Sequence, residues 1–185
     1  MAAATVSKAK FFDAAFEILS DEGFAGLKQS ELCRSLNVTT GAFYHHFKSW
    51  KDFTDQFLAH WHEARTTELV EVARQQFGPE KLLEALIDIA LTLPHRAEAA
   101  IRVWSNLDPY VQSVQESVDL ERFTIIVESA LDIVSDPKVA ATFAKTGMYL
   151  LIGFEQYEKD SHTEALEWSM RLVLESARKL SEENS

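Results

Sequence analysis

The chain has 185 residues, 46% of them hydrophobic, which allows one large domain or two small ones with a substantial core. Its net charge of −11 disfavours nucleic acid as a partner of the whole chain, but the charge is unevenly distributed. Residues 1–51 hold six Lys or Arg and five Asp or Glu, a balance of +1, whereas the rest holds 12 and 24, a balance of −12. The acidity therefore belongs to the C-terminal part and leaves DNA contact to the N-terminal part.

Several classes of protein are disfavoured by what the sequence lacks. No apolar run approaches 18 residues, and the N-terminal stretch lacks the pattern of a signal peptide. The single cysteine, Cys33, excludes an internal disulfide and a Cys-rich metal site, and we expect a cytoplasmic protein. His60 and His62 are two residues apart on a helix and make a poor metal pair. Without a phosphate loop or a nucleophile motif, we expect no enzyme and no cofactor.

Apolar residues recur with helical spacing along nearly the whole chain, which predicts an all-α fold of about nine helices. The first helix ends before Gly23, and the second and third cover about 28–36 and 40–46. A long fourth helix opens at a capping box made by Ser49 and Asp52. Later helices are predicted to begin at Pro79, Pro109 and Pro137 and at a second capping box, Ser161 with Glu164.

The stretch from Gly23 to Phe53 has the pattern of a helix-turn-helix. Asn37 stands where the chain must turn sharply, and Asn tolerates the left-handed conformation better than most residues. Thr39 follows as a side-chain cap for the second helix of the pair. That helix is short and carries small residues and hydrogen-bonding tips, as expected of a recognition helix in the DNA major groove.

This segment resembles the DNA-binding head of the TetR family of bacterial transcription regulators. The matching residues are Gly23-Phe24, Leu32-Cys33, Val38 to Gly41, Tyr44 to Phe47, and Ser49. Three positions depart from the family pattern. Asn37 replaces a Gly, and Lys28 stands where the family often has a Ser or Thr cap. Trp50 replaces a lysine that usually contacts phosphate, and Lys51 follows it.

The resemblance implies a DNA-binding domain over residues 1–50 and an effector-binding and dimerisation domain over 51–185. The side chains expected to contact DNA, whether in the groove or at the phosphates, are Gln29, Ser30, Thr39, Thr40, Gly41, Ala42, Tyr44, His45, His46, Lys48 and Lys51. Contacts to phosphate position the head without reading the base sequence. Phe43 and Phe47 are expected in the core of the head.

The resemblance also implies a ligand pocket and a dimer interface in the larger domain. Candidates for the pocket lining are Trp61, Leu86, Trp104, Phe123, Val127 and Tyr149, and for each of them an ordinary core position is at least as good an explanation. Apolar stripes on the last two helices are candidates for a four-helix dimer interface: Phe143, Gly147, Leu150, Phe154, Leu166, Met170, Val173 and Ala177. From the residues alone, the same stripes fit an intramolecular core.

The predicted function is a dimeric, sequence-specific transcriptional regulator, a repressor that a small-molecule effector releases from a palindromic operator in double-stranded DNA. The sequence does not identify the effector. The alternative is a helical ligand- or protein-binding module of the same fold without regulatory DNA binding, which Lys28 and Trp50 favour.

Overall fold

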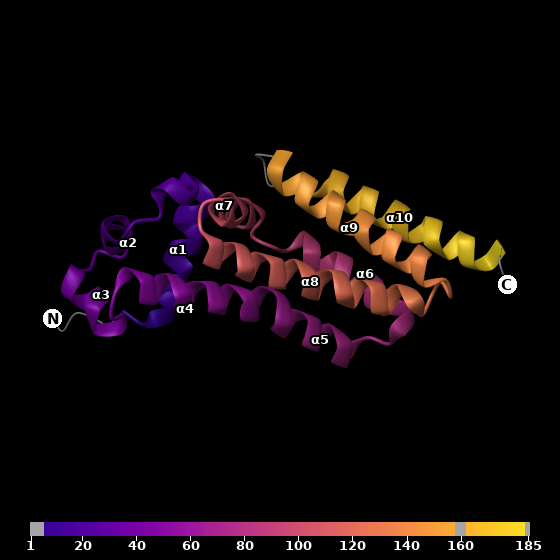
Figure 1. Cartoon of the computed structure of the whole chain (residues 1–185), viewed down its shortest axis with the longest axis horizontal. Helices are drawn as coiled ribbons and strands as arrows, with labels where there is room; N and C mark the ends of the chain where they lie inside the picture. Colours follow the sequence, from indigo (N-terminus) through magenta and orange to yellow (C-terminus); the bar gives the residue numbers. More distant parts are fainter. Residues whose placement is uncertain (1–5, 158–161, 184–185) are drawn as a thin grey trace. The chain divides into compact units, whose positions relative to one another are not determined.

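A computed structural model describes residues 6–157 and 162–183, and over these residues the chain is helical with no strand (Figure 1). The predicted all-α fold is confirmed. The helical elements are α1 Lys8–Glu22, η1 Phe24–Gly26, α2 Gln29–Ser35, α3 Thr40–His46, α4 Trp50–His62, η2 Glu63–Thr67, α5 Glu68–Gln76, α6 Pro79–Leu91, α7 His95–Ser105, α8 Pro109–Leu131, α9 Pro137–Tyr157 and α10 Glu164–Glu183.

The long fourth helix of the prediction corresponds to α4, η2 and α5, which follow one another without a break. Five residues of this stretch, Glu63–Thr67, form a π-helical turn that the apolar pattern did not predict. Counted as one helix, the three elements bring the α-helices of the described residues to the predicted nine. The last helix begins at Glu164 as expected, but Ser161 of its predicted capping box lies outside the described residues.

Three helices begin at proline, as the sequence predicts, and two of them are capped by a preceding aspartate. The Oδ1 atom of Asp108 accepts a hydrogen bond from the N–H of Tyr110 at 2.8 Å. Asp136 Oδ1 accepts from the N–H of Lys138, also at 2.8 Å. Pro79 is the first residue of α6. Proline suits this position because a helix leaves its first N–H groups without an internal partner.

The chain divides into two compact units. Unit 1 contains the residues up to His62 together with Pro94–Gln115, and unit 2 contains Glu63–Leu93 and the residues from Glu116 onward. The candidate DNA-binding segment is therefore part of a larger unit, in which α4 and α7 pack with the first three helices. This division by contacts differs from the functional boundary expected at residue 50.

The core of unit 1 is an aromatic cluster. The rings of Phe11, Phe43, Phe47, Phe53 and Phe57 are fully buried or nearly so. Phe11 meets Phe43 and Phe47 edge to face, with ring centroids 5.9 and 5.5 Å apart. Such pairs add to the free energy gained by burying the rings. These contacts fix α1 against α3 and the residue that follows it, Phe47.

Unit 2 has an aliphatic core to which α6, α8, α9 and α10 contribute. The last two helices lie side by side (Figure 1, orange and yellow). At the surface, Arg171 and Arg178 of α10 form ion pairs with Asp88 and Glu84 of α6, each at 2.8 Å. No helix in the described part of the chain is long and apolar enough to cross a membrane.

Candidate nucleic-acid interface and ligand cavity

The turn between α2 and α3 is made without glycine. Asn37 has a φ of 51°, the left-handed conformation that the sequence predicts for it. Around it, the N–H of Val38 donates to the carbonyl oxygen of Cys33 at 2.9 Å, and the N–H of Asn37 donates to that of Arg34 at 3.1 Å. These bonds satisfy carbonyl groups at the end of α2 and set the direction in which the chain enters α3.

Helix α3 is anchored by its inner face. Thr39 Oγ1 accepts a hydrogen bond from the N–H of Ala42 at 3.3 Å, so the predicted cap is confirmed. Phe43 and the following Phe47 are buried at 0% and 1% exposure, as expected. The outer side chains are therefore held by a rigid element. Thr39, Thr40, Gly41, Tyr44 and His45 are exposed, whereas Ala42 and His46 are half-buried.

The start of α4 holds Lys48 beside the end of α3. Ser49 Oγ accepts from the N–H of Asp52 at 3.0 Å, which confirms the first half of the capping box. The Asp52 carboxylate in turn accepts a hydrogen bond from the N–H of Lys48, at 2.7 Å. This hydrogen bond, followed by one from the Gln56 side chain, lowers the pKa of Asp52. The main chain at Lys48 is thereby fixed, while its side chain remains exposed.

Lys51, expected at a phosphate, already has a partner. Its Nζ lies 2.7 Å from Oδ2 and 2.9 Å from Oδ1 of Asp55, one helical turn later. The ammonium also lies 5.0 Å from the ring centroid of Tyr110. The hydrogen bond to Asp55 raises the pKa of Lys51, so the lysine stays charged across the neutral range. A phosphate would therefore have to compete with Asp55 for this cation.

Trp50 packs inward, where a phosphate-binding lysine would point outward. Its ring stacks at 29° to both Phe53 and Phe43, with centroids 5.0 and 6.1 Å apart. The side chain is half-buried and extends the aromatic core of unit 1. Trp50 thus provides packing at the α3–α4 corner and not the surface charge that the resemblance implies for this position.

Several basic side chains of the head are already bound to other residues, so fewer are available to contact phosphate than their number indicates. Besides Lys51, Lys8 donates to Gln56 Oε1 at 2.8 Å, and Arg34 forms an ion pair with Glu31 on the surface of α2. At the start of α2, Ser30 is exposed, but Gln29 is half-buried and its Nε2 is a buried donor with no hydrogen-bond partner. Lys28 precedes α2 without giving it a side-chain cap.

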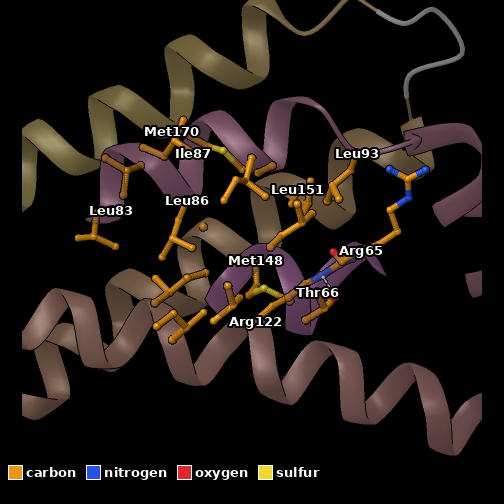
Figure 2. Close-up of a pocket in the computed structure, with 18 of the residues that line it drawn as sticks. Arg65, Thr66, Leu83, Leu86, Ile87, Leu93, Arg122, Met148, Leu151 and Met170 are labelled. Carbon is orange, nitrogen blue, oxygen red and sulfur yellow. Dashed lines mark hydrogen bonds between the residues drawn. The ribbon is translucent and has the colours of Figure 1, made fainter. Parts of the chain in front are cut away.

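Unit 2 contains a cavity of about 100 Å³ between α5, α6, α8, α9 and α10 (Figure 2). Its wall is formed mainly by aliphatic and thioether side chains, including Leu83, Leu86, Ile126, Met148, Leu151 and Met170. The polar or charged side chains in the wall are Arg65, Thr66 and Arg122, and no acidic residue is among the described residues that line it.

The polar corner of the cavity lies against the π-helical turn. Arg122 of α8 is only 8% exposed and its Nε donates to Thr66 Oγ1 at 3.1 Å. The Arg122 Nη2 atom is 3.4 Å from the carbonyl oxygen of Arg65 and donates to it. Figure 2 shows Arg122 and Thr66 joined at one side of the cavity, whereas the Arg65 side chain extends away from the aliphatic cluster.

Comparison with known proteins gives a family match for the segment that contains the helix-turn-helix. Residues 11–53 match the model of the bacterial regulatory proteins of the tetR family. The match covers most of α1, all of α2 and α3, and the start of α4. No curated protein matches the sequence of the chain.

Solved structures of transcriptional regulators share the fold of nearly the whole chain. A transcriptional regulator from Rhodococcus sp. Rha1 has a TM-score of 0.71 at 19% identity, over 94% of this chain and 98% of that one. A putative transcriptional regulator from Saccharomonospora viridis, in complex with choline, has a TM-score of 0.75 at 12% identity, over 91% and 95%. A TetR-family transcriptional regulator from Streptomyces coelicolor has a TM-score of 0.71 at 15% identity, over 92% and 95%. At these low identities the likeness shows that the fold is shared.

The residues predicted to line a pocket lie mostly outside the wall of the cavity in unit 2. Leu86 does line the cavity of unit 2. Trp61 is fully buried in unit 1, where its Nε1 donates to Glu98 Oε1 at 2.7 Å. Trp104 stacks on Phe24 in the same unit, with ring centroids 5.0 Å apart. Large aromatic side chains indicated burial, but the pattern could not show which core they enter.

The other three predicted lining residues are not part of the cavity wall. Tyr149 is 70% exposed on α9, and Val127 packs against the core of unit 2. Phe123 is half-buried on α8. The wall is formed instead by aliphatic and methionine side chains with Arg122 and Thr66. Arg122 and Thr66 were missed because a charged residue and a threonine inside helical segments carry no sequence signal for a pocket.

The predicted dimer stripes of α9 and α10 face largely inward. Leu166, Met170 and Ala177 are 3–7% exposed in the core of unit 2. Phe143, Leu150 and Phe154 are partly buried against the same core, and Gly147 and Val173 line the cavity. The large apolar side chains that α9 and α10 expose are Tyr149, Tyr157, Trp168, Leu172 and Leu180.

Proposed function

We propose that the chain is a homodimeric transcriptional repressor that binds a palindromic operator through α3 and releases it when a small molecule fills the cavity of unit 2. The observation that carries this proposal is the outer face of α3 in a TetR head. Thr40, Gly41, Tyr44 and His45 are exposed on a helix whose inner face is anchored by Phe43. A recognition helix needs this combination of a rigid base and exposed polar tips.

The contacts to DNA are proposed to be of two kinds. Thr40, Tyr44 and His45 would meet base edges in the major groove, since they are exposed on the recognition helix. Lys48, with its exposed side chain and fixed main chain, would bind phosphate. Lys51 would join it after exchanging Asp55 for phosphate.

A small-molecule effector is supported by the cavity of unit 2. Ligand sites are typically apolar hollows with a few well-placed polar groups, and this cavity has aliphatic walls and one polar corner. The similar fold from Saccharomonospora viridis is in complex with choline, so a protein of this architecture takes a small molecule. Occupancy would lower operator affinity by favouring a different conformation, and DNA would lower effector affinity by the same factor.

A homodimer is supported by the exposed apolar side chains of the last two helices. Trp168 and Leu172 are 68% and 45% exposed and lie one turn apart on α10, so they share a face. Large apolar side chains grouped on a surface often mark an interface. We propose that this face, with parts of the predicted stripes that remain accessible, forms the contact between two copies.

Selection from random double-stranded oligonucleotides, followed by gel shifts at several salt concentrations, tests the proposal. The expected result is a palindromic consensus bound much more tightly than random DNA, with two chains per duplex by sedimentation. Weak binding without sequence preference would refute it. That result would favour the alternative, a ligand- or protein-binding module, which the inward packing of Trp50 and the Lys51–Asp55 pair favour.

A further inference from the structure

The cavity of unit 2 offers a ligand almost no polar contact. Its wall is nearly all hydrocarbon and thioether surface, from side chains such as Leu83, Leu151 and Met170. We propose that the molecule filling this cavity is a compact, uncharged, apolar compound that packs against Gly147 of α9. This inference rests on the proposed effector function and specifies the chemical class of the effector.

The polar groups at the edge of the cavity are engaged with one another. Arg122 Nε donates to Thr66 Oγ1 at 3.1 Å, and Arg122 Nη2 donates to the carbonyl oxygen of Arg65 at 3.4 Å. The side chain of Arg65 extends away from the aliphatic cluster (Figure 2). A charged ligand would lose its hydration in this cavity and would regain few hydrogen bonds from the wall, so its entry would be strongly unfavourable. An uncharged hydrocarbon has no such cost and gains free energy by leaving water.

The volume limits the size of the ligand. The cavity measures about 100 Å³, and an apolar cavity of about 150 Å³ accepts benzene. The ligand is therefore on the order of one aromatic ring or a short alkyl chain. Met148 and Met170 of the wall can adjust to slightly different shapes, because their side chains are unbranched and flexible.

Gly147 leaves open space at one point of the wall. Phe143 and Leu151, one helical turn before and after it on α9, also line the cavity, so a side chain at position 147 would share their face. A β-carbon added to Gly147 would meet no neighbouring atom within 4 Å. A ligand can therefore lie close to the backbone of α9 here, and a larger residue at this position would take up part of the ligand's space.

Three probes of similar size separate charge from shape. Toluene, benzoate and benzylammonium are titrated calorimetrically into the full chain at neutral pH. Toluene should bind more tightly than either ion by at least about 100-fold, because the wall does not solvate a charge. The two ions carry opposite charges, so weak binding of both shows that the cavity rejects charge of either sign.

Substitutions at Gly147 then locate the ligand. Gly147→Leu should lower the affinity for toluene by at least about tenfold, because its side chain competes for the same space, and Gly147→Ala should lower it less. The matched control is Gly153→Leu. Gly153 is an exposed glycine of the same helix, has no neighbouring atom within 4 Å of an added β-carbon, and is not part of the cavity wall. This control should bind toluene as the original chain does. Circular dichroism melts identify any variant that fails to fold, and if Gly147→Leu does so, Gly147→Ala decides.

The outcomes distinguish this inference from the function on which it rests. Binding of either ion as tight as that of toluene, no binding of toluene, or unchanged toluene affinity in the folded Gly147 variant would each overturn the apolar ligand at Gly147. The effector function would still stand if a charged or larger molecule released the chain from its selected DNA. That function fails separately if a chain that binds its operator is released by no member of a chemically broad library.

Discussion

The ion pair between Lys51 and Asp55 gives two substitutions opposite expected effects on DNA binding. In the protein without DNA, Asp55 Oδ2 lies 2.7 Å from Lys51 Nζ and binds the ammonium group that would otherwise bind a phosphate. Lys51→Ala should weaken binding to every DNA sequence, because it removes a phosphate contact. Asp55→Asn should strengthen binding to every sequence, because it frees the lysine and removes a negative charge near the phosphates.

The magnitudes follow from exposure and from the release of counterions. The two side chains are 75% and 36% exposed, so the pair contributes little to stability, and both variants should fold. Each lost phosphate contact lowers the slope of log affinity against log salt by about 0.9, or about 1.8 for two heads. When the salt concentration rises from about 50 to about 200 mM, both proteins lose operator affinity. The fold-loss for Lys51→Ala should be roughly 12 times smaller than the fold-loss for the original chain.

Fluorescence anisotropy with the selected operator and a scrambled duplex, across that salt range, measures both effects. Lys145→Ala is the matched control, because it removes an exposed lysine from α9 in unit 2. Its slope should equal that of the original chain. A slope that is unchanged in Lys51→Ala would show that this lysine contacts no phosphate. Weaker binding by Asp55→Asn would show that Asp55 orients the lysine instead of competing for it.

Three further predictions address the groove, the core and the dimer. Gly41→Ala should keep the fold, because the added carbon would meet only Thr39 Oγ1, at 3.6 Å. It should reduce operator affinity, measured by anisotropy, because the proposed contact brings the backbone of α3 close to DNA. Unchanged affinity would show that DNA does not approach the chain at Gly41. Trp61→Phe should cost about 1–3 kcal/mol in urea unfolding, because Glu98 loses a buried donor, and an unchanged midpoint would contradict this. Trp168→Glu should give folded monomers by sedimentation, whereas Met170→Glu, 7% exposed, should unfold unit 2. A persistent dimer of Trp168→Glu would exclude that face.

The local features of the head could be predicted because they depend on neighbouring residues. The left-handed Asn37, the Thr39 cap and the Ser49 cap are set by backbone geometry within about four residues, and the structure contains all three. Burial of Phe43 also follows from its position in a short helix. The ion pair of Lys51 with Asp55 was not predicted. Asp55 is four residues after Lys51, and this spacing places both side chains on one face of the helix.

The sites of the larger part could not be located from spacing alone. A helical stripe shows that one face is apolar, but an intramolecular core and a dimer interface require the same stripe. Leu166 and Met170 fit either alternative in the sequence, and the structure places them inward. The cavity depends on side chains from five helices, and its polar corner depends on Arg122 meeting Thr66 across 56 positions of the chain. Such long-range pairs leave no trace in local periodicity.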